Sequence, residues 1–89
     1  MRRIVQRNQF RRNYKQQGKR GKNLDKLDTV VALLVHYGTL DQTYRPHKLT
    51  GEWLGKWEYH IEPDWLFIYE PTPEEIVLHR TGTHADLFE

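Results

Sequence analysis

Three histidines stand in separate short segments of this chain, and each is placed where it could do proton chemistry. They are His47 in YRPHKL, His60 in HIEPDW and His84 in RTGTHADLF. Histidine is the side chain best suited to proton transfer near neutral pH. Asp64, four residues after His60, adds a carboxylate. These residue types indicate a general acid–base catalyst.

The charge of the chain is strongly asymmetric and suggests an anionic target. Residues 1–24 hold nine of the fourteen Lys and Arg residues and none of the twelve acids, although the net charge is only +2. A basic arm of this kind favours nucleic acid or an acidic protein as a partner over a merely solvated helix face. The cations expected to contact such a partner are Arg7, Arg11, Arg12, Lys15, Lys19, Arg20 and Lys22.

Length and composition limit the classes of protein to consider. The 89 residues allow one domain, spanning 1–89. Without cysteine the chain has neither disulfides nor a thiolate metal site. Its longest apolar run, Val30 to Val35, is too short to cross a bilayer, and the arginine-rich start lacks the apolar stretch of a signal peptide. We expect a cytoplasmic protein without membrane contact.

The first half of the chain predicts one strand and two helices. Residues 2–6 can form a short strand, and Phe10 and Tyr14 share one face of a basic helix over 8–17. Asn23 is a suitable N-cap for a second helix, whose apolar stripe recurs at helical spacing until Gly38 ends it. Residues 39–50 have no clean period and predict a loop.

The second half predicts three strands. In residues 56–61 Trp57, Tyr59 and Ile61 alternate with polar residues, which is typical of a strand with one buried side. Residues 64–70 are almost wholly apolar and predict a central strand, and residues 75–81 form the next, ended by Gly82. The predicted fold is α+β, with two N-terminal helices packed on a small antiparallel sheet.

Four segments in a fixed order resemble the YafQ branch of the RelE/ParE toxin superfamily. They begin with His47 to Leu49 and Gly51-x-Trp53-x-Gly55. They continue with His60-x-Glu62-Pro63-Asp64-Trp65-x-x-x-Tyr69 and end with Arg80-Thr81-Gly82-Thr83-His84-x-x-Leu87-Phe88. The resemblance covers the chain from the second helix to Phe88. It departs from the family pattern at Lys48 and at Lys56-Trp57-Glu58, where the family often has Pro and Tyr-Arg-Asp.

The resemblance implies a RelE-like microbial RNase fold and a toxin of a type II toxin–antitoxin system. Such toxins are ribosome-dependent endoribonucleases that cut translating mRNA. The implied partners are a cognate antitoxin protein, the 70S ribosome with its mRNA, and operator DNA only through the antitoxin complex. The family's functional positions fall on His47, His60, Asp64, His84 and Phe88, with Trp65 and Arg80 nearby.

RNA can be cut without metal, because its 2′-hydroxyl can attack the adjacent phosphate. We assign His84 as general acid and leave His60 and Asp64 as alternatives for the general base. Positive charge for the transition state would come from Arg80, His47 or Lys56. No metal ion or other cofactor is expected, because His47, His60 and His84 show no His-x₂₋₄-His spacing among themselves and the resemblance implies a metal-independent reaction.

The roles of the aromatic residues and of the two remaining histidines are interpreted separately. Trp65 and Phe88 are interpreted as RNA contacts, with packing in the core or tail as the alternative. Trp53 and Trp57 are expected to pack. His36 and His79 match no motif and are expected to be structural.

Two other functions remain open at this point. A ParE-like toxin would bind DNA gyrase and cut no RNA, but that branch is not expected to carry these histidine motifs. An inactive toxin-fold protein would serve only in operon repression, and the altered stretch at residues 56–58 leaves room for it.

Overall fold

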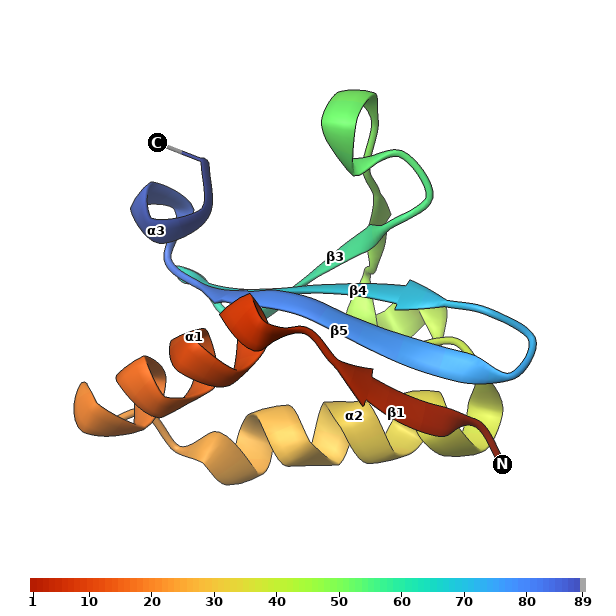
Figure 1. Ribbon diagram of the computed structural model, residues 1–89, viewed down its shortest axis with the longest axis horizontal. Coiled ribbons are helices and arrows are strands. Elements are labelled where there is room, and N and C mark those ends of the chain that lie inside the picture. The colour runs from red at the N-terminus through yellow and green to blue at the C-terminus, as the bar shows by residue number, and fades with distance from the viewer. Residues whose placement is uncertain (89) are drawn as a thin grey trace.

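In the computed structural model, which describes residues 1–88, two long helices lie against one face of a single sheet (Figure 1). In chain order the strands and helices are β1 (Arg3–Gln6), α1 (Asn8–Lys19), α2 (Leu24–Tyr37), β2 (His47–Lys48), β3 (Trp57–Glu62), β4 (Trp65–Pro71), β5 (Glu75–Gly82) and α3 (His84–Phe88). Two 3₁₀ turns, η1 (Gln42–Tyr44) and η2 (Gly51–Trp53), interrupt the loop before β3. The predicted α+β class and element order are confirmed, and β2 and α3 are additions.

The sheet is mixed: the predicted antiparallel pairing holds for β2 to β5, and β1 alone runs parallel to its neighbour. Its strand order is β1-β5-β4-β3-β2, and β1 pairs parallel with β5, whereas the other neighbours are antiparallel. Strands β3, β4 and β5 follow one another through short turns, so they pair antiparallel. β1 is separated from the rest by two helices, and this crossover lets it run alongside the last strand in the same direction.

The second helix begins and ends where its sequence predicts. The Asn23 side chain accepts a hydrogen bond of 3.1 Å from the Asp25 backbone N–H. Gly38 follows the helix at φ 80°, the left-handed conformation that glycine adopts without cost, and its N–H donates to the Leu34 carbonyl. α1 runs two residues further than predicted, to Lys19.

The main core lies between the helices and one face of the sheet. Leu27 and Leu34 of α2 are fully buried against side chains of the central strands, among them Phe67. Trp57 and Tyr59 of β3 pack against the same cluster, as the alternation predicts. Because one face of the sheet is buried in this core, the opposite face is the one available for a functional site.

The opposite face of the sheet carries a smaller cluster. Leu66 and Ile68 of β4 are fully buried there under Leu87 of α3, with Leu49 and Trp53 packed beside them. These contacts attach the C-terminal helix and the loop before β3 to the sheet, on the side away from α1 and α2 (Figure 1).

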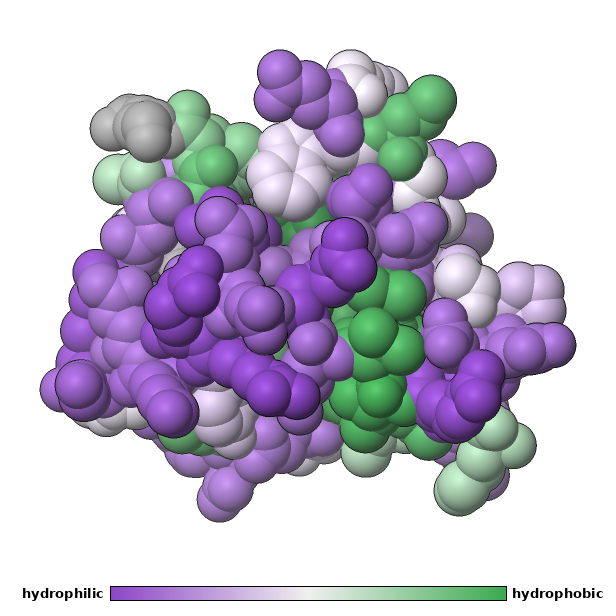
Figure 2. Space-filling view, in the orientation of Figure 1, coloured by the Kyte–Doolittle hydropathy of each residue, from purple (hydrophilic) through white to green (hydrophobic). Residues whose placement is uncertain are grey.

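The surface of the molecule is largely hydrophilic on the side that Figure 2 shows, with purple side chains over α1 and one hydrophobic strip beside them. Within residues 1–88, no helix has the length and apolar character needed to cross a bilayer.

Candidate active site

The three histidines predicted from the sequence gather in a row on the face opposite α1 and α2. The ring centroids of His47 and His60 lie 6.3 Å apart, and those of His60 and His84 lie 6.2 Å apart. All three side chains are exposed. The row therefore offers three imidazoles to a substrate laid across this face.

Strand pairing brings the first two histidines together. His47 of β2 is directly opposite Glu58 of β3 in the antiparallel register, and His60 follows Glu58 by two residues on the same face of the strand. The connection between the two strands, residues 49–56, folds β2 back along β3, so two separate motifs share one site.

The third histidine is held by the start of α3. The Asp86 side chain accepts a 2.9 Å hydrogen bond from the Thr83 N–H, and the Thr83 hydroxyl accepts one of 3.1 Å from the Asp86 N–H. Arg20 donates to Asp86 at 2.7 Å and ties the end of α1 to this turn. These hydrogen bonds lower the pKa of the Asp86 carboxyl to about 2, with the Arg20 contact as the largest cause.

Asp64 contacts the backbone of His84. Asp64 lies in the turn between β3 and β4, and its Oδ1 accepts a hydrogen bond of 3.2 Å from the His84 N–H. Asp64 therefore belongs to the cluster, as predicted, and it has a positioning contact in addition to a carboxylate that could accept a proton.

Glu58 is a member of the site that sequence reasoning missed. Its Oε1 lies 2.8 Å from Nε2 of His60, and its side chain is 13% exposed, against 40% for His60. Because a carboxylate accepts the Nε2–H, the neutral His60 ring keeps its lone pair on Nδ1. The signal was the i, i+2 spacing on a strand, which places Glu58 on the face of His60.

Phe88 and Trp53 form an aromatic wall beside His84. The Phe88 ring centroid lies 5.5 Å from that of His84 and 6.1 Å from that of Trp53, and Phe88 remains partly exposed. Trp53 and Trp57 pack as expected, against the small and the main cluster respectively. Phe88 is available to a base next to His84.

The prediction that Trp65 contacts RNA was wrong. Trp65 is fully buried in the main core, and its indole N–H donates a 3.0 Å hydrogen bond to the Thr81 hydroxyl. The alternation of β4 points Trp65 toward the helices, away from the histidine row. Trp65 thus lies on the opposite face of the sheet from the histidine row, although it directly follows Asp64 in sequence.

Arg80 and Lys56 are both half-buried. Arg80 donates from Nε to the Asn13 side chain at 2.7 Å and from Nη2 to the Asp86 carbonyl at 3.3 Å, which braces α1 and α3 against β5. Lys56 immediately precedes β3, and its carbonyl accepts from the Leu49 N–H.

Two of the seven cations predicted to contact a partner are paired inside the protein. Arg20 pairs with Asp86, as described, and Lys22 pairs with Glu62 at 3.1 Å and lies over the Trp65 ring. The other five are Arg7, Arg11, Arg12, Lys15 and Lys19, and all of them are exposed.

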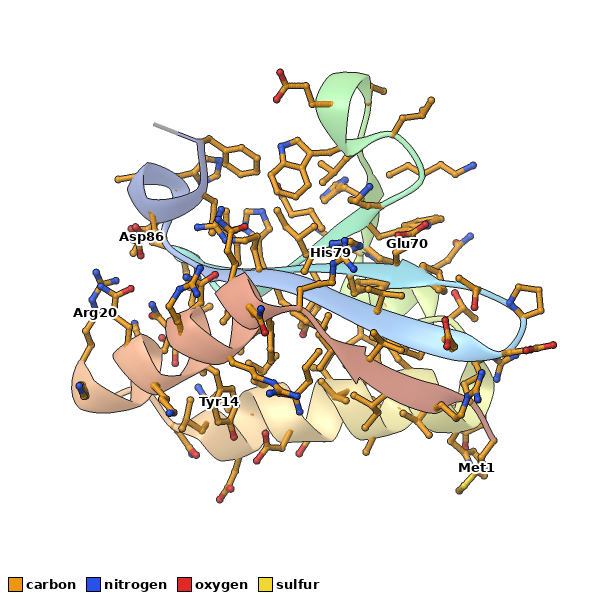
Figure 3. The ribbon with its side chains drawn as sticks, viewed as in Figure 1. Met1, Tyr14, Arg20, Glu70, His79 and Asp86 are labelled. Carbon is orange, nitrogen blue, oxygen red and sulfur yellow. The ribbon has the colours of Figure 1, made fainter. Side chains whose placement is uncertain are left out.

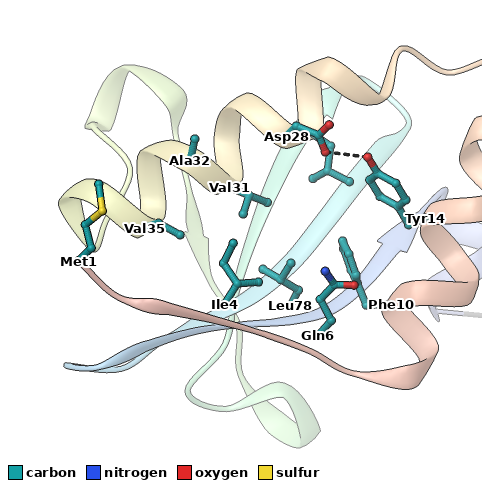
Figure 4. Close-up of a pocket in the computed structure, with 11 residues that line it drawn as sticks. Met1, Ile4, Gln6, Phe10, Tyr14, Asp28, Val31, Ala32, Val35 and Leu78 are labelled. Atoms are coloured by element: carbon teal, nitrogen blue, oxygen red, sulfur yellow. Dashed lines mark hydrogen bonds between the residues drawn. The ribbon is translucent and has the colours of Figure 1, made fainter.

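A separate apolar cavity of about 530 Å³ lies among β1, α1 and α2, on the helix side of the sheet (Figure 4). Ile4, Val31 and Leu78 line it, and Tyr14 donates a 2.7 Å hydrogen bond to Asp28 at its edge. Burial, followed by this contact with Asp28, raises the pKa of Tyr14 to about 12. The cavity contains none of the predicted site residues.

The histidine row is not arranged as a metal centre. Within the part of the chain that the structure describes, no group of three or more His, Asp or Glu side chains is close enough to hold a metal ion. The carboxylates near the row already contact His60 and the backbone of His84.

Comparison with known proteins shows to which family this chain belongs. Residues 2–89 match the family described as the bacterial toxin of a type II toxin–antitoxin system, YafQ. The chain belongs to this family. It is 40% identical over 81 residues to the mRNA interferase toxin YafQ of Escherichia coli strain K12, covering 90% of this chain and 88% of that protein.

Solved structures of bacterial toxins share the fold. The crystal structure of the E. coli DinJ–YafQ toxin–antitoxin complex has a TM-score of 0.89 at 38% identity, with 99% of this chain and 98% of that chain covered. A metal-bound toxin from Helicobacter pylori has a TM-score of 0.87 at 32% identity, with 99% and 100% covered. This chain is thus a YafQ-family toxin, and the family assignment favours the mRNA interferase hypothesis over the gyrase hypothesis.

Proposed function

We propose that this YafQ-family toxin cuts translating mRNA on the ribosome by metal-independent acid–base catalysis, with the RNA 2′-hydroxyl as nucleophile. The observation that carries the proposal is the row of His47, His60 and His84, with ring centroids about 6 Å apart on an open face. Two imidazoles at such a distance can serve the attacking and the leaving oxygen of one phosphodiester.

His60 is the better general base. Glu58 accepts its Nε2–H, so Nδ1 carries the lone pair that can take the proton of the 2′-hydroxyl. The Oδ1 of Asp64 is already engaged by the His84 backbone, which favours a positioning role for this carboxylate. Between the two alternatives that the sequence left open, the geometry therefore supports His60.

His84 then completes the reaction as general acid. The 2′-oxygen forms a bond to phosphorus as His60 takes its proton. The bond from phosphorus to the 5′-oxygen breaks, and protonated His84 supplies the proton to that oxygen. The products are a 2′,3′-cyclic phosphate and a free 5′-hydroxyl. A protonated His47 beside His60 would stabilise the extra charge on the phosphoryl oxygens.

The ribosome is the proposed source of substrate positioning. The three histidines are exposed, so the toxin alone would hold a flexible RNA strand only weakly in position. The five exposed cations of residues 7–19 suit contact with ribosomal RNA phosphates. This function places the protein in the cytoplasm.

Inhibition by an antitoxin is the second part of the proposal. The E. coli toxin is found in a complex with DinJ, and we infer a cognate antitoxin that covers the basic α1 surface with an acidic segment. Ribosome binding and antitoxin binding would then compete, and operator DNA would be reached only through the complex.

The test is mRNA cleavage in a purified translation system, mapped by primer extension with and without ribosomes. We expect cuts that require ribosomes and disappear in His84→Ala and His60→Ala. Circular dichroism would show that both variants are folded. Absence of cuts by the folded wild-type protein would contradict the proposal and favour the repressor function.

A further inference from the structure

A second histidine–carboxylate pair lies on the face of the histidine row. His79 of β5 and Glu70 of β4 are joined by a 2.9 Å contact between Nε2 and Oε1, and Figure 3 shows both on the side of the sheet away from α1 and α2. The His79 side chain is 13% exposed. His79 was expected to be structural, and the mechanism above leaves the pair unused.

Strand register places this pair on the substrate face. His60 is opposite Leu66 and Glu58 is opposite Ile68, so Leu66 and Ile68 share the face of the histidine row. Glu70 continues the same alternation on β4. Glu70 follows Leu66, the residue opposite His60, by four residues, so at about 3.3 Å per residue the pair lies about 13 Å from His60 along the strands. This distance corresponds to roughly two nucleotides of extended RNA.

A β-bulge directs His79 to this face. The pairing of β4 with β5 passes from Ile68–Arg80 to Tyr69–Leu78, and His79 is the residue left without a partner. Leu78, directly before it, is buried on the helix side. Bulges re-aim side chains and are frequent beside active sites.

Two cations flank the pair. Lys56 precedes Trp57, whose opposite residue on β4 is Tyr69, so Lys56 lies beside Glu70. The Arg7 N–H donates to the carbonyl of Leu78, next to His79. Neither cation forms an ion pair within residues 1–88. Burial lowers the pKa of His79, and the charges of Lys56 and Arg7 act in the same direction, whereas Glu70 opposes them.

We propose that Glu70, His79, Lys56 and Arg7 form a subsite for a backbone phosphate of the RNA strand, beside the site of cleavage. An incoming phosphate would neutralise the cations and favour a protonated His79 that bridges it to Glu70. The inference rests on the proposed RNA cleavage and adds where the uncut part of the strand is held.

The first experiment measures steady-state cleavage on programmed ribosomes. His79→Gln and Lys56→Met should each raise KM about tenfold, because each removes one charge-assisted hydrogen bond to the phosphate, with kcat within about twofold. Exposed His36→Gln and Glu74→Gln, placed away from this face, should match wild type. In the wild-type protein KM should rise from pH 6 to pH 8, as His79 loses the proton that phosphate binding requires, and His79→Gln should flatten this rise.

The outcomes separate the two proposals. If the wild-type protein cuts mRNA and both variants keep its KM, the subsite is wrong and the cleavage mechanism stands. If the wild-type protein cuts nothing, the mechanism is wrong, and the subsite is judged by NMR of the full chain titrated with a short 2′-O-methyl RNA. A shifted His79 ring signal with a raised pKa would support the subsite, and an unmoved signal would overturn it. Lys56→Met keeps the test valid if His79→Gln fails to fold.

Discussion

The Nε2 atom of His60 lies 2.8 Å from Oε1 of Glu58, two residues earlier on the same face of β3. Glu58 is well shielded, whereas His60 is open to solvent. A shielded carboxylate can hold an exposed imidazole in one tautomer and one orientation, which gives the proposed general base a fixed lone pair. The two-residue period of the strand thus places the Glu58 carboxylate beside the proposed general base.

Glu58→Gln should lower kcat about tenfold and leave ribosome affinity unchanged, because the amide oxygen still accepts the Nε2–H but no longer stabilises the protonated ring. Glu58→Ala should lower kcat further. Single-turnover cleavage and ribosome co-sedimentation measure the two quantities. Equal kcat for Glu58→Ala and wild type would remove Glu58 from the site.

Asp64 variants distinguish a base from a positioning group. If its carboxylate only accepts the His84 N–H, Asp64→Asn should keep kcat within about threefold, since an amide oxygen also accepts. Asp64→Ala should then lower kcat roughly tenfold or more. If both variants are equally inactive although folded, Asp64 is the general base and the assignment of His60 is wrong.

The Arg20–Asp86 contact should make the stability of α3 sensitive to acid. The folded-state pKa of Asp86 is about 2, below its unfolded value, so its contribution is present above about pH 4 and is lost as pH falls toward 2. We expect Asp86→Asn to reduce the free energy of unfolding at pH 7 by about 1–2 kcal/mol. Urea unfolding at pH 7 and pH 2.5 should show a smaller difference between the proteins at the lower pH.

Trp65 and Phe88 should give opposite results. Trp65→Phe removes the donor to Thr81 from a fully buried site and should cost about 1–3 kcal/mol of stability, with kcat little changed in the folded protein. Phe88→Ala should lower cleavage severalfold and change stability by less. Thermal melting measures the stability of both variants, and a cleavage assay measures their activity. A Trp65 variant that is stable but inactive would restore the hypothesis that Trp65 contacts RNA.

The exposed cations of α1 should make ribosome binding depend on salt. The double variant Arg11→Gln and Lys15→Gln should weaken binding uniformly and reduce the slope of log affinity against log salt by about one for each phosphate that is no longer bound. Arg3→Gln, on β1 and paired with Glu75, is a control for the removal of a positive charge outside α1. A salt response that is flat in the wild-type protein would argue against phosphate binding by α1.

By itself the sequence determined most of the local elements and pointed to the three histidines that the fold brings together. Asn23 marks the start of α2 and Gly38 marks its end, because N-capping and the left-handed conformation are properties of single residues. The alternation of β3 assigned Trp57 and Tyr59 to the core, because side chains on a strand point to opposite faces in turn. The three histidine motifs were recognisable because each is short and contiguous.

Only the tertiary structure decided which motifs meet and which face they use. It paired β1 in parallel with β5 and brought His47 opposite Glu58 across strands. It also buried Trp65, although Asp64 directly before it contacts the His84 backbone. The bulge that turns His79 toward the substrate face arises from the register of β4 with β5. Register and strand direction depend on contacts between residues far apart in the chain, and a local pattern does not contain them.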